Sequence, residues 1–136
     1  MGLLVNIDVD DLERATAFYT TVFGLKVGRR FDRWATELLG FESPLYLLVK
    51  DAGTLPHPHA ALGRSYERHW TPVHLDFAVD DLEAVARRAE EGGATREGEV
   101  QERSWGRIAY FADPWGHGFC LLQFKGRGYD EIATPA

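Results

Sequence analysis

The pentapeptide VDDLE occurs twice, at Val9–Glu13 and at Val79–Glu83, 70 residues apart in a chain of 136. Before each copy, apolar residues alternate along a stretch that predicts a β-strand, over Leu3–Val9 and Val73–Val79. After each copy, apolar residues recur at helical spacing. The paired aspartates suit a helix start, because their side chains accept free backbone amides. VDDLE therefore predicts a strand-to-helix junction that is used in two copies of one unit.

Three further strands are predicted after each helix. They span Leu25–Phe31, Trp34–Leu39 and Leu45–Lys50 in the first copy, and Ala94–Gln101, Trp105–Ala112 and Gly118–Phe124 in the second. Each copy therefore reads β-α-β-β-β, over residues 3–50 and 73–124. Residues 51–72 are expected to link the copies, and residues 125–136 to form a loose tail. We expect a single domain over residues 1–136.

Composition limits the possible partners and the compartment. The net charge of −6 argues against a nucleic-acid partner, which requires a basic face. It is compatible with a cationic ligand, but acidic residues also serve solubility alone. No apolar run is long enough to span a membrane, and no secretory leader is visible. A single cysteine, Cys120, cannot form an internal disulfide. These features together predict a cytoplasmic protein.

The repeated pattern resembles a known superfamily. A paired β-α-β-β-β unit with VDDLE…FYTTVFGLKV in its first copy and YFADPWGHGFCLLQF in its second is similar to the vicinal oxygen chelate superfamily. Glyoxalase I, bleomycin-resistance proteins, fosfomycin-resistance enzymes and extradiol dioxygenases belong to that group. The resemblance implies an α+β fold in which two βαβββ units form a curved mixed sheet around a cleft. It also implies a homodimer, because a second chain often completes the cleft.

The resemblance further implies a divalent metal held by a His on the first strand of a unit and a Glu on the last. The positions that match are Leu4, Tyr46, His74 and Cys120, with Leu47 in place of Tyr46 if the register slips by one residue. His74 alone is a good ligand, and a catalytic metal normally has three. We therefore predict no metal and no cofactor. A zinc site made of His74, Cys120 and Asp76 remains an alternative.

Seven residues are predicted to line a ligand site: Asn6, Tyr46, His74, Asp76, Trp105, Arg107 and Cys120. Trp105 begins a strand, and Arg107 is expected on the same face. Trp34 stands at the equivalent place in the first copy. The two tryptophans either clamp a planar ligand or belong to the core or a dimer interface. His57 and His59 lie in the proline-containing linker and His117 in a turn, where ligation is not expected.

Two functions follow from this pattern. The first is a metal-independent protein that binds a planar or aromatic small molecule, as in the drug-sequestering members of the superfamily. The alternative is an enzyme of the lyase, isomerase or dioxygenase type. There His74 would be the catalytic base, with Asp76 or Tyr46 nearby, or a ligand of an atypical divalent metal.

Overall fold

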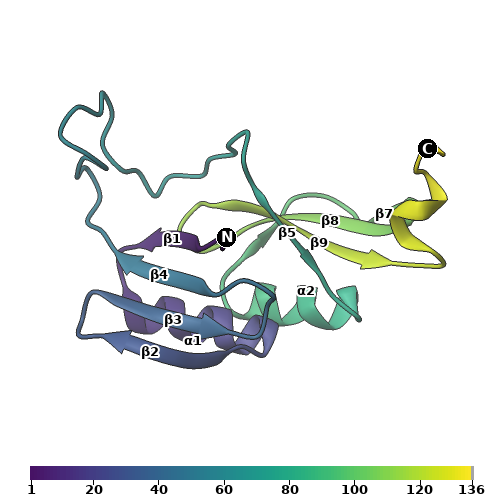
Figure 1. Ribbon diagram of the computed structural model, residues 1–136, viewed down its shortest axis with the longest axis horizontal. Helices are drawn as coiled ribbons and strands as arrows, with labels where there is room; N and C mark the ends of the chain where they lie inside the picture. The colour runs from purple at the N-terminus through teal and green to yellow at the C-terminus, as the bar shows by residue number, and fades with distance from the viewer. Residues whose placement is uncertain (136) are drawn as a thin grey trace. The chain divides into compact units, whose positions relative to one another are not determined.

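The computed structural model describes residues 1–135 and divides into two compact units, Met1–Glu67 and Arg68–Ala136. Each unit consists of one mixed β-sheet with one α-helix packed on it (Figure 1). This arrangement confirms the α+β class and the duplicated unit. Neither helix in residues 1–135 is long and apolar enough to cross a membrane.

Unit 1 contains the first copy of the repeat. Its elements are β1 (Val5–Val9), α1 (Leu12–Phe23), β2 (Lys26–Phe31), β3 (Ala35–Leu39) and β4 (Leu45–Val49). The strand order is β1-β4-β3-β2, with β1 parallel to β4 and the other pairs antiparallel. The four predicted strands are confirmed, and three of them begin one or two residues later than expected.

Unit 2 contains the second copy and two departures from the prediction. Its elements are β5 (Leu75–Ala78), α2 (Leu82–Glu91), β6 (Thr95–Arg96), β7 (Gln101–Arg103), β8 (Gly106–Ala112), β9 (Gly118–Phe124) and the 3-10 helix η1 (Gly128–Glu131). The strand order is β5-β9-β8-β6, and β7 also pairs with β8. The single strand predicted over Ala94–Gln101 is wrong: it is broken at Gly98, whose φ of +103° interrupts the extended chain. Part of the tail, Gly128–Glu131, forms η1 rather than being loose.

The two VDDLE copies form the same junction. The Asp11 side chain accepts a hydrogen bond from the backbone N–H of Arg14, and Asp81 accepts one from Ala84, both at 3.0 Å. Each aspartate is therefore the N-cap of its helix. The structure confirms the predicted role of the motif as a strand-to-helix junction.

Both cores lie between a helix and one face of its sheet. In unit 1 this face presents Leu38, Leu45 and Leu47, and in unit 2 it presents Phe111 and Leu121, all buried. Because side chains alternate along a strand, the neighbouring residues point to the opposite face. We call that opposite face of each sheet, away from its own helix, the helix-free face. The functional candidates on the strands lie there, with one exception described below.

Candidate functional site

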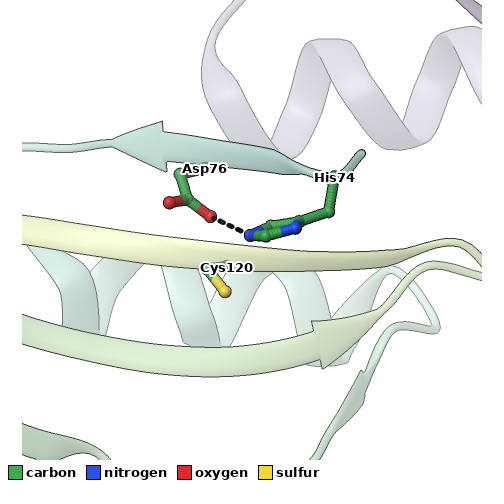
Figure 2. Close-up of side chains that lie close together, drawn as sticks. All are labelled: His74, Asp76 and Cys120. Carbon is green, nitrogen blue, oxygen red and sulfur yellow. Dashed lines mark ion pairs between the residues drawn. The ribbon is translucent and has the colours of Figure 1, made fainter. Parts of the chain in front are cut away.

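Three side chains with possible metal-ligating atoms meet on the helix-free face of unit 2 (Figure 2). Asp76 on β5 is the register partner of Cys120 on β9. His74 stands just before β5, which begins at Leu75 and not at Val73 as predicted, and its side chain lies beside Asp76. The ligating atoms of His74, Asp76 and Cys120 all lie within 4.8 Å of one another. His74 Nε2 lies 3.4 Å from Asp76 Oδ1. The parallel pairing of β5 with β9 thus brings together three of the seven predicted site residues.

Cys120 is held as a neutral thiol. The residue is only 1% exposed. Burial, together with the neighbouring Asp76 carboxylate, raises the pKa of the Cys120 thiol to about 12. Thiolate, and not thiol, is the form that attacks electrophiles and ligates metals. At neutral pH the side chain therefore behaves as a small apolar group that donates its S–H to Asp76.

Aromatic rings flank this cluster near His74, where β5 begins. The Trp70 ring lies 4.7 Å from the His74 ring and 6.0 Å from the Tyr110 ring, centroid to centroid. Trp70 also packs against Gly118, where an added Cβ would lie 2.1 Å from the indole. A side chain at Gly118 would therefore displace Trp70. Tyr110 is the register partner of Cys120, which places it on the same face of the sheet.

A second aromatic group stands where β9 ends. The Trp105 ring lies 5.9 Å from the Phe124 ring and 5.2 Å from the Tyr129 ring, and Phe124 and Tyr129 lie 4.8 Å apart. Burial raises the pKa of Tyr129, and the charges of Asp76 and Cys120 raise it further. Trp105 is thus among aromatic neighbours, as the clamp hypothesis requires. Whether it contacts a ligand stays a prediction.

Trp70, Tyr110 and Tyr129 are not among the site residues predicted from the sequence. Tyr110 could have been found, because it lies at an alternate position of a predicted strand. Trp70 was assigned to the linker and Tyr129 to the loose tail, and both segments lack a regular period. Their approach to the cluster depends on tertiary folding.

The equivalent face of unit 1 is occupied differently. Asn6 and Tyr46 are register partners, as Asp76 and Cys120 are in unit 2, which confirms Tyr46 and not Leu47 as the counterpart of Cys120. Tyr46 donates its hydroxyl to Glu37 at 2.7 Å, and Arg29 forms an ion pair with Glu37 at 2.6 Å. Hydrogen bonds from Arg29 and Tyr46 lower the pKa of Glu37 to about 2. Hydrogen bonding to Glu37 raises the pKa of Tyr46.

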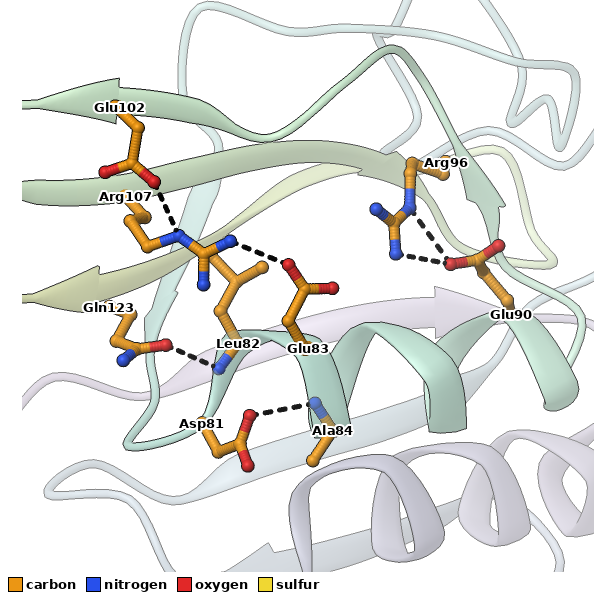
Figure 3. Close-up of polar contacts among 9 residues, drawn as sticks. All are labelled: Asp81, Leu82, Glu83, Ala84, Glu90, Arg96, Glu102, Arg107 and Gln123. Carbon is orange, nitrogen blue, oxygen red and sulfur yellow. Dashed lines mark hydrogen bonds and ion pairs between the residues drawn. The ribbon is translucent and has the colours of Figure 1, made fainter.

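Arg107 is the exception among the predicted site residues. Its guanidinium contacts Glu83 of α2 at 2.7 Å and Glu102 of β7 at 3.0 Å (Figure 3). Its register partner Gln123 accepts a hydrogen bond from the backbone of Leu82, which also lies on α2. The expectation that Arg107 shares a face with Trp105 is therefore wrong. Arg107 lies on the helix side, where it tethers α2 to the sheet.

The remaining histidines are not among the candidate metal ligands that converge in this cluster. His117 Nδ1 lies 2.9 Å from His69 Nε2, so its turn is pinned to the segment before β5. His57 and His59 lie in the exposed part of the linker. Among residues 1–135, the set His74, Asp76 and Cys120 is the one group of three or more candidate metal ligands that converges.

Comparison with known proteins identifies the family of this chain. The model of a glyoxalase-like domain matches residues 4–122, which is most of the chain. This chain belongs to the glyoxalase-like family. Among solved structures, it is similar to the fosfomycin resistance protein FosX of Listeria monocytogenes, with a TM-score of 0.71, 20% identity and 98% of each chain covered. It also resembles a glyoxalase/bleomycin resistance protein/dioxygenase family enzyme of Burkholderia phytofirmans PsJN, with a TM-score of 0.66, 20% identity, and 90% of this chain and 97% of that chain covered.

Curated relatives of the glyoxalase-like family are longer than this chain. The anthracycline biosynthesis protein DnrV of Streptomyces peucetius is 29% identical over 132 residues, which cover 97% of this chain and 44% of that protein. Lactoylglutathione lyase GLX1 of Arabidopsis thaliana is 30% identical over 121 residues, which cover 85% of this chain and 41% of that protein. The chain thus spans less than half the length of these relatives.

The metal implied by the superfamily resemblance does not fit the donors in this glyoxalase-like chain. Of the four matching positions, Leu4 has no donor atom and the Tyr46 hydroxyl is engaged with Glu37. In unit 2 the last-strand position carries a buried thiol instead of a carboxylate. Mg²⁺, Mn²⁺ and Fe²⁺ prefer oxygen or mixed oxygen–imidazole shells, which this set does not supply.

Proposed function

We propose that this chain binds a planar or aromatic small molecule on the helix-free face of unit 2, without a divalent metal. The observation that carries the proposal is the placement of aromatic rings around the His74–Asp76–Cys120 cluster. Trp70 and Tyr110 flank it at one end, and the rings of Trp105, Phe124 and Tyr129 gather where β9 ends. Aromatic pairs contribute about 0.5–1.5 kcal/mol each beyond the area they bury, so several rings can hold a flat ligand.

Two further observations support this function. The strand residues between the aromatic groups are apolar, since Ile108 and Leu122 face each other in register. Small-molecule sites are commonly apolar, with a few polar groups that orient the ligand. DnrV, one of the relatives, is an anthracycline biosynthesis protein, and anthracyclines contain a planar system of fused rings.

Metal content and ligand binding are tested on the same preparation. We expect less than one divalent ion per chain as purified, and no change in thermal midpoint with EDTA. A bound metal at a hundredfold excess over its dissociation constant would stabilise the fold by about 2.7 kcal/mol. Calorimetric titration with dihydroxyanthraquinone, a planar aromatic probe, should give saturable binding. One stoichiometric metal ion with a clear loss of stability on chelation would contradict metal independence, and absence of binding would contradict the ligand class.

A second candidate is an enzyme that uses His74 as a general base. The His74–Asp76 pair favours it, because a carboxylate that accepts from one ring nitrogen orients the imidazole and leaves the other nitrogen free for proton transfer. The similarity to a lactoylglutathione lyase is consistent with this chemistry. If the wild type converts a ligand, and His74→Ala binds that ligand normally but no longer converts it, then the protein is an enzyme. An atypical zinc ion on His74, Asp76 and Cys120 belongs to this candidate, and the metal analysis tests it.

The assembly and the compartment remain predictions. We expect a homodimer, because the superfamily resemblance implies a cleft that a second chain completes. Light scattering at micromolar concentration should give twice the chain mass of 15.3 kDa, and a monomer mass would contradict the dimer. The cytoplasmic location stays a prediction.

A further inference from the structure

The Asp76 carboxylate has an unusual set of neighbours for an acid in unit 2. Within residues 68–135, five cationic side chains of unit 2 form ion pairs with glutamates: Arg68 with Glu97, Arg96 with Glu90, Arg107 with Glu83 and Glu102, Lys125 with Glu102, and Arg127 with Glu131. Asp76 pairs only with the His74 imidazole. Its side chain is 36% exposed, so a ligand can reach it.

The hydrogen bonds of Asp76 leave room for a further donor. Asp76 Oδ1 lies 3.4 Å from His74 Nε2, which leaves the second carboxylate oxygen without an ion-pair contact. That contact uses Oδ1, and the S–H of Cys120 is a weak donor. A carboxylate offers about four lone-pair sites. Asp76 can therefore accept from a ligand without losing either of its present neighbours.

The rings around Asp76 add to its attraction for a positive charge. The face of an aromatic ring carries partial negative charge and attracts a cation within about 6 Å of the centroid. The Trp70 ring lies 4.7 Å from the His74 ring and 6.0 Å from the Tyr110 ring, and Tyr110 is the register partner of Cys120, so both rings stand beside the cluster that contains Asp76. A carboxylate among aromatic rings is suited to an ammonium group.

From this arrangement we propose that the ligand carries a protonated amine, which binds Asp76 while its planar part lies against the rings. The inference rests on the proposed function and names the class of ligand for that site. Unit 1 offers no such arrangement, because neutral Asn6 stands where unit 2 has Asp76. The buried acid of unit 1, Glu37, is already paired with Arg29.

Two matched probes separate the amine from the ring system. Aminomethylanthracene is a cation at neutral pH, whereas hydroxymethylanthracene has the same rings and no charge. We expect the amine to bind wild type at least about tenfold more tightly than the alcohol, a difference of about 1.4 kcal/mol. In Asp76→Asn the two affinities should become equal, with the affinity for the alcohol unchanged. Asp80→Asn, which removes the same charge from an exposed aspartate, should keep the wild-type ratio.

The outcomes distinguish this inference from the proposed function. Equal binding of both probes to wild type overturns the amine and leaves aromatic binding intact. If Asp76→Asn keeps the wild-type ratio of amine to alcohol affinity, another group binds the ammonium, and the inference is also overturned. If neither probe binds, the proposed function fails and the inference with it. If circular dichroism shows that Asp76→Asn does not fold, the ratio of the two affinities in the wild type still tests the inference. Salt raised from about 0.02 M to about 0.5 M must weaken amine binding more than alcohol binding.

Discussion

Units 1 and 2 are built alike on their helix sides and differently on their helix-free faces. Both begin with an aspartate-capped helix after a parallel-paired strand, and both bury leucines against that helix. On the opposite face, Asn6, Tyr46 and Glu37 in unit 1 stand where unit 2 has Asp76, Cys120 and Tyr110. Folding constrains one face of each sheet, so the other face is free to differ between the copies.

The difference decides where each unit places its charge. In unit 1 the acid is buried, and Arg29 and Tyr46 satisfy it, so it forms a closed structural network. In unit 2 the acid stands at the surface of the cluster, with a histidine and aromatic rings around it. We therefore expect changes on the unit 1 face to affect stability, and changes on the unit 2 face to affect binding.

The largest expected effect tests whether the helix sides are equivalent. Leu47 on β4 and Leu121 on β9 hold matching positions, each one residue after the Tyr46–Cys120 pair, and both are fully buried. Leu47→Ala and Leu121→Ala should each lower the free energy of unfolding by about 2–5 kcal/mol, because each leaves a cavity. Denaturant titration measures both values. If only one of the two substitutions destabilises the chain, the packing of the two copies is not equivalent.

The next effect concerns Cys120 as the counterpart of Tyr46. Raising the pKa of Cys120 from 9 to about 12 leaves roughly a thousandfold less thiolate at a given pH. Iodoacetamide at mildly alkaline pH should therefore leave native protein almost unmodified, as mass spectrometry would show. The same reagent should label the chain in denaturant, which is the internal control. Rapid labelling of native protein would mean that the thiol is exposed or activated, contrary to its neutral, buried state.

A third effect separates the two tryptophans that begin equivalent strands. Trp105→Ala should weaken binding of the aromatic probe by about 1–3 kcal/mol, or about one to two decades in affinity. Trp34 is 56% exposed and contacts Arg33 at 4.6 Å, so Trp34→Ala should leave probe binding unchanged. Calorimetric titration of both variants provides the comparison. If Trp105→Ala unfolds the chain or binds the probe as tightly as wild type, Trp105 is a structural residue.

What could be predicted from the sequence follows the same division between faces. The repeat, both helices and nearly all strands come from periods and caps, which are local signals. Tyr46 was matched to Cys120 correctly, because alternation fixes the face of a residue once its strand is known. Arg107 was predicted on the same face as Trp105, and this was wrong. Trp105 lies before β8, so the alternation of side chains along β8 does not extend to it. Trp70 and Tyr129 could not be predicted, since aperiodic segments carry them to the cluster.

The smallest expected effect lies in the closed network of unit 1 and appears as a dependence on pH. Its partners lower the pKa of Glu37 from the ordinary 4.5 to about 2. A lowered native pKa contributes stability above the unfolded value, and this is lost as pH falls towards the native value. Glu37→Gln should therefore be less stable than wild type near neutral pH, with a difference that shrinks between pH 4.5 and pH 2. Arg29 is largely solvent-exposed, which screens the pair and keeps the effect modest.

The control for this prediction is Glu42→Gln, which alters an exposed glutamate of the same unit. Its unfolding free energy should stay within about 0.5 kcal/mol of wild type, as is usual for surface substitutions. Denaturant unfolding of the three proteins across the acid range measures both differences. Because the Glu37 network lies on the unit 1 face, Glu37→Gln should also bind the aromatic probe as wild type does. A Glu37→Gln variant that keeps its stability at neutral pH but loses the probe would place the ligand on the unit 1 face and reverse the division of roles.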